Sequence, residues 1–200
     1  MSSQLSERAK QLIPKARIVS FNRWKSSHSD EVLQIFQQAD DQGRYLTDED
    51  LNNIKTLNTE QSSAVEKARF LRDNADLIVN YAREQVLATY PQITELGGGL
   101  YPPERAEACW RDFWHFLRCI TYGIAGNSSQ FTSLEGLQNM DLLYQELQVP
   151  LDAMICGLEN LKIYSLQHFK PEQQQELTPY FDHLISHLKD FHRNPISDKI

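Results

Sequence analysis

The chain has 200 residues, of which 40% are hydrophobic and 24% are charged, and its formal net charge is −7. This composition is ordinary for one globular domain, and no apolar run approaches the roughly 18 to 20 residues that span a bilayer, which excludes a transmembrane helix. An acidic chain also argues against nucleic-acid binding, which needs a basic face. The first residues lack the basic-then-apolar pattern of a secretory signal, so we expect a cytoplasmic protein.

The charge is unevenly distributed along the chain. Residues 1–28 contain six basic residues and one acidic residue, a net charge of +5, so the remainder carries −12. With Phe21 and Trp24 interleaved among the cations, this segment suits an acidic partner or an anionic membrane surface. Chain ends are also often frayed and solvated, and the sequence leaves that alternative open.

Apolar residues recur at helical spacing from residue 29 onward. The first predicted helix carries its apolar side chains at Val32, Ile35, Phe36 and Ala39. It ends at the turn-forming residues 40–43. Thr47 with Asp50 three residues later is a variant capping box that opens the second helix, so the two helices form an N-terminal hairpin. Another amphipathic helix follows between residues 68 and 87.

Glycine and proline residues mark the loop before the next helix. Gly97-Gly98-Gly99 permits backbone angles that other residues resist, and Pro102-Pro103 is suited to a first helical turn. After that helix, three further amphipathic stretches lie within residues 134–147, 155–166 and 180–188. No comparable run of alternating β-branched residues is present, so the predicted fold class is all-α.

The helix after the glycine loop carries the most informative cluster of side chains. Cys109-Trp110-Arg111-Asp112 brings a thiol, a guanidinium and a carboxylate within one helical turn. Cys109 and Asp112 share a face at i, i+3, and Phe113 and Phe116 continue that face. No histidine adjoins the cysteine in sequence to act as its base, so the cluster suits an extended, nitrogen-bearing ligand better than hydrolysis. We therefore expect a protein that is not an enzyme.

The other cysteines and the histidines favour simpler interpretations. Cys109 and Cys119 lie roughly 15 Å apart along one helix, too far for a disulfide. Cys119 and Cys156 are expected to be small buried apolar residues. His183 and His187 are spaced i, i+4, but two ligands without a third do not make a zinc site, and a solvated face is the better interpretation.

The cysteine helix and its neighbours resemble the phycobiliproteins, most closely the allophycocyanin α type. The segments that carry the resemblance are Ala108–Asp112, Phe116–Asn127, Ala39–Lys55, Pro91–Tyr101, Val149–Ala153, Leu161–Lys162 and Tyr180–Asp182. The resemblance covers roughly residues 29–190 and implies a globin-like helical core with an N-terminal helical hairpin. It leaves residues 1–28 as a basic N-terminal extension and residues 191–200 as a C-terminal tail.

The resemblance also implies a cofactor, a covalently attached open-chain tetrapyrrole of the phycocyanobilin type. Cys109 would form a thioether with this bilin, and Asp112 would accept hydrogen bonds from its central pyrrole N–H groups. Arg111 would hold a propionate with its planar guanidinium fork. Arg105 is a second propionate candidate, although it suits a solvated first-turn residue equally well. Tyr122 is a candidate for the pocket wall.

The function implied is that of a bilin-binding light-harvesting or energy-transfer protein of a phycobilisome, at the cytoplasmic face of the thylakoid membrane. The alternative is a pigment-free assembly, regulatory or interaction protein that retains the fold. The expected partners are phycobiliprotein subunits, in a heterodimer or homo-oligomer within ring assemblies. Because the resemblance begins only near Ser29, we expect residues 1–28 to serve contact rather than folding.

Overall fold

The computed structural model describes residues 5–58 and 62–192. The regular structure of these residues is helical, apart from an isolated antiparallel bridge between Val19 and Thr132. The helices are α1 (Glu7–Leu12), η1 (Ile13–Lys15), η2 (Asn22–Trp24), α2 (Asp30–Asp41), α3 (Asp48–Leu57), α4 (Ser62–Asp73), α5 (Ala75–Thr89), α6 (Pro103–Ala125), α7 (Leu134–Glu146), α8 (Leu151–Leu166) and α9 (Pro171–Lys189). The predicted all-α fold class is confirmed.

The helices α2 and α3 form the predicted N-terminal hairpin. Ser29 begins α2 by accepting a hydrogen bond from the backbone N–H of Val32. Thr47 and Asp50 form the predicted capping box at the start of α3, each side chain accepting from the other residue's backbone N–H. Between the helices Gly43 has a φ of 63°, a left-handed angle that glycine adopts without steric strain.

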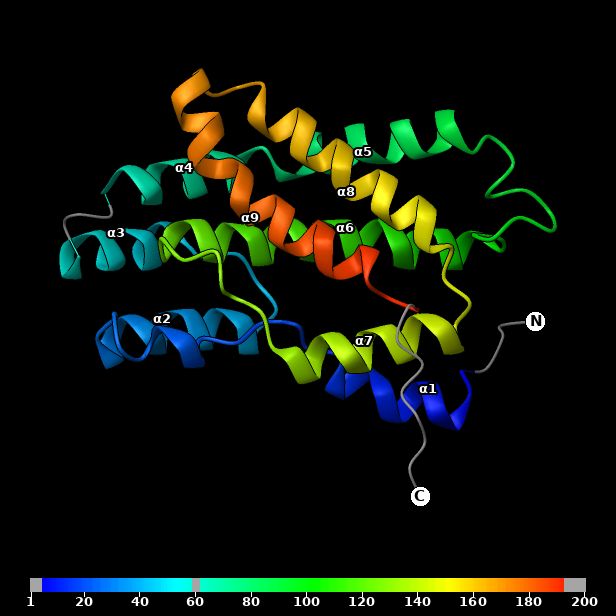
Figure 1. The fold of residues 1–200 in the computed structure, drawn as a ribbon, viewed down its shortest axis with the longest axis horizontal. Coiled ribbons are helices and arrows are strands. Elements are labelled where there is room, and N and C mark those ends of the chain that lie inside the picture. The colour runs from blue at the N-terminus through cyan, green and yellow to red at the C-terminus, as the bar shows by residue number, and fades with distance from the viewer. Residues whose placement is uncertain (1–4, 59–61, 193–200) are drawn as a thin grey trace.

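The long helix α6 lies at the centre of the fold (Figure 1). Every residue from Phe116 to Ala125 is buried, as expected of a helix that other elements surround. The helices α4, α5, α8 and α9 contact it, and α5 also packs along α8. At Gly157 of α8 an added Cβ would lie 2.0 Å from the Phe113 ring, so only glycine permits this close approach of α8 to α6.

The described part of the N-terminal extension, residues 5–28, packs against the body of the protein. The short helices α1 and η1 lie along α7, with Ala9 completely buried between them and the body. Further along, Ile18, Phe21 and Trp24 join the main hydrophobic core, and Trp24 is only 1% exposed. Burial of such side chains contributes substantially to the free energy of unfolding.

Backbone hydrogen bonds attach the extension to the segment that leads into α7. The N–H of Ser20 donates to the carbonyl of Phe131 at 2.9 Å, and the N–H of Ser133 donates to the carbonyl of Ile18 at 2.7 Å. The Trp24 indole donates to the carbonyl of Gln130 at 3.0 Å. The expectation that these residues serve contact rather than folding is therefore wrong for the described part of the extension, because they complete the core.

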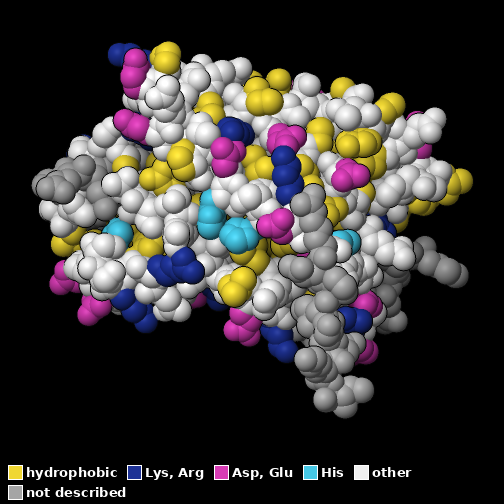
Figure 2. Space-filling view, viewed as in Figure 1, with side chains coloured by type: hydrophobic (Ala, Val, Ile, Leu, Met, Phe, Trp, Pro, Cys, Tyr) yellow, Lys and Arg dark blue, Asp and Glu magenta, His cyan; other side chains and the backbone are white. Residues whose placement is uncertain are grey.

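Much of the extension's positive charge is neutralised within the chain. Arg17 donates to the carboxylates of Asp40 at 2.7 Å and Asp41 at 2.8 Å, and Arg8 lies 3.7 Å from Glu146. Figure 2 shows acidic and basic side chains interspersed over the visible face rather than gathered by sign. The acidic body is thus itself a partner for the basic extension.

Of the predicted C-terminal tail, residues 191–200, only Phe191 and His192 lie within the described residues. Phe191 is buried, and its ring centroid lies 6.0 Å from that of Tyr144 in α7. The backbone N–H of His192 donates to the carboxylate of Asp141 at 3.2 Å. The start of this tail therefore packs on α7 as well.

Candidate functional site

Cys109 and Asp112 lie on the same face of α6, as their spacing predicts. Pro103 opens this helix, where its fixed φ suits the first turn. Cys109 is only 3% exposed, and Asp112 is half-buried. Burial, with a smaller effect from the charge of Asp112, raises the pKa of the Cys109 thiol to about 12. The thiol is therefore almost entirely protonated at neutral pH, which lowers its nucleophilicity.

Tyr144 of α7 covers this face of α6. Its hydroxyl donates a hydrogen bond of 2.9 Å to Oδ2 of Asp112, and its side chain is 3% exposed. Burial raises the pKa of Asp112 to about 6, against the opposite effects of the Tyr144 hydrogen bond and the positive charge of Arg111. No hydrogen bond from a residue of the described ranges reaches the other carboxylate oxygen, Oδ1. The carboxylate therefore keeps an acceptor for a ligand N–H group.

The two arginines of the predicted site differ in how much they are engaged. Arg111 is exposed and makes no hydrogen bond or ion pair with the described part of the chain, so its guanidinium remains open to a carboxylate. Arg105 instead donates to the backbone carbonyls of Leu147 and Gln148. These carbonyls end α7, where a cation is favourable. Arg105 thus fastens the end of α7 to the start of α6.

The glycine loop before α6 is closely packed. A Cβ at Gly98 would lie 2.3 Å from the carbonyl oxygen of Ile93, so this contact requires glycine. The N–H of Leu100 donates to the same Ile93 carbonyl at 2.8 Å, and Leu100 is buried. Gly99 lies against Pro150, which precedes α8. The loop therefore fixes the start of α6 relative to the start of α8.

Tyr122 is not brought to Cys109 by the fold. It lies 13 residues further along α6, about 20 Å at 1.5 Å per residue. There its hydroxyl accepts a hydrogen bond of 2.7 Å from Arg118 and donates to the carbonyl of Arg44. Arg118 also donates to Asp40 at 3.0 Å. Tyr122 belongs to a second polar cluster, separate from the thiol.

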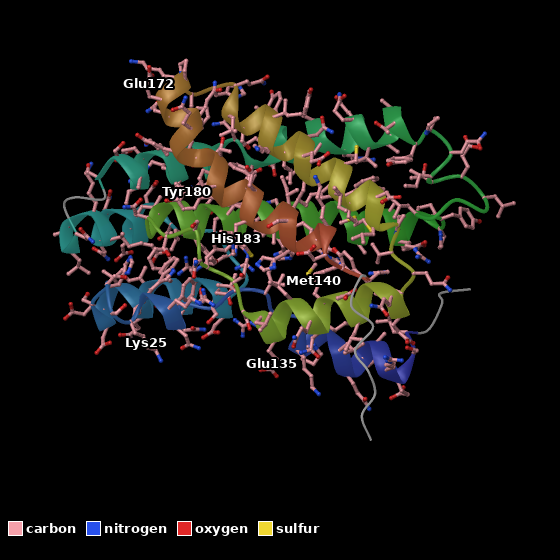
Figure 3. The ribbon with its side chains drawn as sticks, in the orientation of Figure 1. Lys25, Glu135, Met140, Glu172, Tyr180 and His183 are labelled. Carbon is pink, nitrogen blue, oxygen red and sulfur yellow. The ribbon has the colours of Figure 1, made fainter. Side chains whose placement is uncertain are left out.

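The remaining cysteines and histidines form no alternative centre within the described residues. All three cysteines are free, with Cys119 buried and Cys156 half-buried. His183 and His187 of α9 have ring centroids 4.7 Å apart, but no group of three or more residues suited to a metal ion occurs in the ranges that the structure describes. His183 bonds to Thr132 at 2.8 Å, and it lies near the middle of the face shown in Figure 3.

The helix α7 is positioned by its own amphipathic pattern. Ser133 caps it by accepting from the N–H of Gly136. Met140 faces the core and Glu135 faces solvent, as Figure 3 shows. Tyr144 lies one turn beyond Met140 on the buried side. The sequence contained a signal for Tyr144, because a tyrosine on the buried face of a helix needs a partner for its hydroxyl, but the partner itself was missed.

Within residues 5–58 and 62–192, which the structure describes, no helix has both the length and the hydropathy required to cross a membrane.

The fold is all-α, and its central helix carries a cysteine and an aspartate on one face. Comparison with known proteins identifies the family that has these features. The profile of the phycobilisome protein family matches residues 34–188. An allophycocyanin subunit alpha-B from Synechocystis sp. is 31% identical over 157 residues, which cover 78% of this chain and 98% of that protein. This chain belongs to the phycobilisome protein family.

Two further relatives give the same result. An allophycocyanin alpha-B chain from Cyanophora paradoxa is 30% identical over 154 residues, covering 77% of this chain and 95% of the relative. An allophycocyanin alpha chain from Mastigocladus laminosus is 31% identical over 158 residues, covering 78% and 98%. The predicted phycobiliprotein resemblance and the globin-like all-α fold class are thereby confirmed.

Proposed function

We propose that this chain carries a bilin on Cys109 and acts, without enzymatic activity, in light harvesting or energy transfer within a phycobilisome or a related assembly. The observation that supports the proposal is the pairing of Cys109 and Asp112 on one face of α6. Both residues lie inside the part of the chain that matches the family. No histidine of the described residues hydrogen-bonds the thiol, which argues against a thiol enzyme.

The groups on this face fit an open-chain tetrapyrrole of the phycocyanobilin type. Cys109 would add its sulfur to one carbon of an exocyclic double bond, and the thiol proton would pass to the neighbouring carbon. One S–C bond forms, one π bond is lost, and neither an oxidant nor a reductant is required. A thioether rather than a reversible contact would hold the ligand to α6.

Asp112 and Arg111 would recognise the polar groups of the same ligand. Asp112 has a carboxylate oxygen available for pyrrole N–H groups, and its negative charge favours their protonated form. Arg111 is exposed and unpaired within the described residues, so it suits a propionate. Arg105 would first have to release the carbonyls at the end of α7. Tyr122 lies too far along α6 to line the pocket around Cys109.

The bound bilin would supply visible absorption, and the chain's residues would hold it extended. Ordering a flexible ligand is unfavourable in entropy, and the covalent bond together with the contacts to Asp112 and Arg111 offsets that loss. Because burial holds the pKa of Cys109 at about 12, the thiol must become more accessible before it reacts. The structure therefore corresponds to a closed form of the site.

The partners that we propose are other phycobiliprotein subunits, in a heterodimer or homo-oligomer of a ring assembly. The outer side of the α2–α3 hairpin exposes Leu57 and contains a shallow hollow of about 320 Å³, lined by Ile35 and Gln38 of α2 and by Asn53 of α3. Most side chains that line the hollow are polar, and the exposed apolar side chain of Leu57 beside them favours a protein contact. The proposed location is the cytoplasmic face of the thylakoid membrane.

We propose that the extension contacts an acidic partner or a membrane surface only through basic side chains that point to solvent. Arg8 and Arg17 are paired within the chain. Lys15 and Lys25 are exposed, and Figure 3 shows Lys25 at the edge of the molecule beside α2. These two lysines are therefore the candidates for such a contact.

A pigment-free assembly or regulatory protein is the second candidate function. The observation that favours it is the burial of Cys109, which is only 3% exposed. In that case Cys109 and Asp112 would be buried residues of the core, and the hairpin surface would carry the function. The two candidates differ in one measurable property, the modification of Cys109.

The deciding experiment is expression of the full chain in cells that synthesise phycocyanobilin. We expect a visible absorption band and, in tryptic peptides analysed by mass spectrometry, a bilin adduct on Cys109. Cys109→Ser should lose both, whereas Cys156→Ser should keep both. An unmodified Cys109 in a colourless protein would support the pigment-free candidate, and an adduct only on Cys119 or Cys156 would contradict the assignment of the site.

The role of Asp112 is tested in the same system with Asp112→Asn, which keeps the shape of the side chain and removes its charge. The long-wavelength band should weaken or shift to the blue, and fluorescence should fall, because the pyrrole protons lose their carboxylate partner. Glu107→Gln, an exposed carboxylate on the same helix, is the matched control. A fully loaded Asp112→Asn protein with an unchanged spectrum would rule out this role.

A further inference from the structure

The helix α7 is fastened at its beginning by the N-terminal extension. The N–H of Ser133, which caps α7, donates to the carbonyl of Ile18 at 2.7 Å. An added Cβ at Gly136 would lie 1.9 Å from the carbonyl oxygen of Arg17, so the extension runs directly against the backbone of the first turn. Such close backbone contact leaves little freedom for this end of α7 to move away.

The extension also holds the end of α7. The hydroxyl of Ser6 donates to Glu146 at 2.6 Å, and Arg8 lies 3.7 Å from the same carboxylate. Between these polar contacts Ala9 is completely buried in the contact of α1 with α7. In Figure 1 the ribbon of α1 accordingly runs alongside α7. The extension therefore contacts α7 at both of its ends.

The C-terminal end of α7 contacts α6 on either side of Cys109 in sequence, at Arg105 and at Asp112. Tyr144 donates to Asp112 at 2.9 Å and is 3% exposed, and Arg105 of α6 donates to the carbonyls of Leu147 and Gln148. Because α1 and η1 pack on α7, this end of α7 can move away from Asp112 and the turn that carries Cys109 only if its contacts with the extension are loosened.

The fastening segment lies outside the part of the chain that matches the family. The profile match begins at residue 34, whereas the contacts to α7 come from residues 6–20. The alignment with the Synechocystis relative covers 98% of that protein but only 78% of this chain. The segment is thus an addition to a domain that the relatives otherwise share.

We propose that residues 6–20 form a strap that holds α7 closed over Cys109, and that release of this strap exposes the thiol. The strap sets how often Cys109 is open, and so controls when it reacts with an incoming electrophile. The inference rests on the proposed function only in naming a bilin as the natural electrophile. Local opening of one element without global unfolding is the physical process it requires.

The test is pulsed labelling of the pigment-free full-length protein with N-ethylmaleimide, followed by denaturation, digestion and mass spectrometry of each cysteine peptide. Ala9→Glu places a charge in the buried contact between α1 and α7 and should release the strap. Labelling of Cys109 should then accelerate by about tenfold, as local opening allows. Cys119, buried elsewhere on the same helix, reports global unfolding, and its labelling should not change.

A second, milder variant keeps the test decisive if Ala9→Glu destabilises the whole fold. Ser6→Ala combined with Glu146→Gln removes the polar contacts at the end of α7 together with the Ser6 cap of α1, and should give a smaller acceleration confined to Cys109. Lys10→Glu is the matched control, because Lys10 is exposed and, among the residues that the structure describes, forms an ion pair only with Glu7. Unchanged Cys109 labelling in the milder variant, or equal acceleration at Cys109 and Cys119, would overturn the strap. Since no bilin is used, either result is independent of whether the protein carries pigment.

Discussion

The two halves of α6 bury polar groups in opposite ways. In the C-terminal half Arg118 donates to Asp40 at 3.0 Å and to the Tyr122 hydroxyl at 2.7 Å. In the N-terminal half the thiol of Cys109 makes no hydrogen bond with the described residues, and Asp112 accepts only one, from Tyr144. The same helix therefore carries a paired cluster at one end and an incompletely paired cluster at the other.

The electrostatics of the two clusters differ accordingly. Burial by itself lowers the pKa of Arg118, but neighbouring Cys119, Tyr122 and Asp40 raise it above its usual range, so the charged form is favoured. At the other end burial prevails and disfavours the charged forms, raising the pKa of Cys109 to about 12 and that of Asp112 to about 6. Groups kept in such an unfavourable state are typical of binding sites, whereas fully paired groups are typical of structural networks.

The largest effect should come from removing Trp24, the larger of the two aromatic residues that the extension contributes to the core. Trp24 packs against Phe36 with ring centroids 5.1 Å apart, and its ring fills the space beside Gly126 at the end of α6. Trp24→Ala should lower the free energy of unfolding by about 4 kcal/mol, measured by urea denaturation. Lys25→Ala, an exposed neighbour, should change little. Equal stability of the two variants would contradict the role of the extension in the core.

The sequence predicted the body of the fold more completely than the extension. The hairpin, its capping box and most of the later helices follow from local periodicity and turn residues, which need no knowledge of distant contacts. The single helix predicted between residues 68 and 87 is wrong, because the chain breaks at Asn74 into α4 and α5. The extension lacked a long helical pattern, and its apolar residues Ile18, Phe21 and Trp24 are spaced three apart over less than two helical turns. Their burial depends on distant contacts such as that between the rings of Phe21 and Tyr122, which no local pattern reports.

The second effect concerns the ion pairs of the same half. Asp40→Ala leaves Arg118 buried without its carboxylate and also removes a partner of Arg17. Because an uncompensated buried charge is strongly destabilising, we expect a loss of about 3 kcal/mol in the free energy of unfolding. Asp41→Ala is the control, since Asp41 is an exposed partner of Arg17 and its removal should matter far less. A control as destabilising as Asp40→Ala would show that burial of the pair is not decisive.

The sequence predicted part of the candidate site but not its contacts with α7. Helical geometry alone places Cys109 and Asp112 on one face, so that pair could be predicted. Tyr144 lies 32 residues away from Asp112 in the chain, and the attachment of Arg105 to the end of α7 depends on how two helices pack. Tyr122 is on the same helix as Cys109 but lies several turns away. Two residues of one long helix therefore need not lie in the same site.

The smallest effect should come from Asp112→Asn in the incompletely paired half. Unlike the two variants above, it should increase the free energy of unfolding. Burial raises the pKa of Asp112 from 3.8 to about 6, so between these values the folded state holds a proton that the unfolded state has lost. The free energy of unfolding therefore falls as the pH rises through this window, and remains lower above it. Asp112→Asn cannot ionise, and should be more stable than the parent at pH 7.5 by about 1–2 kcal/mol, allowing for partial solvent access.

Urea denaturation of both pigment-free proteins at a series of pH values measures this difference directly. The advantage of Asp112→Asn should be small near pH 4, grow up to about pH 6 because there only the unfolded parent has lost its proton, and level off above the folded pKa of about 6. Glu107→Gln, exposed on the same helix, should show no such growth. A pH-independent advantage would mean that side-chain packing rather than ionisation separates the variants. Growth with pH would show that the negative charge of Asp112 destabilises the pigment-free protein. Such a charge is expected in a site that binds a positively polarised ligand.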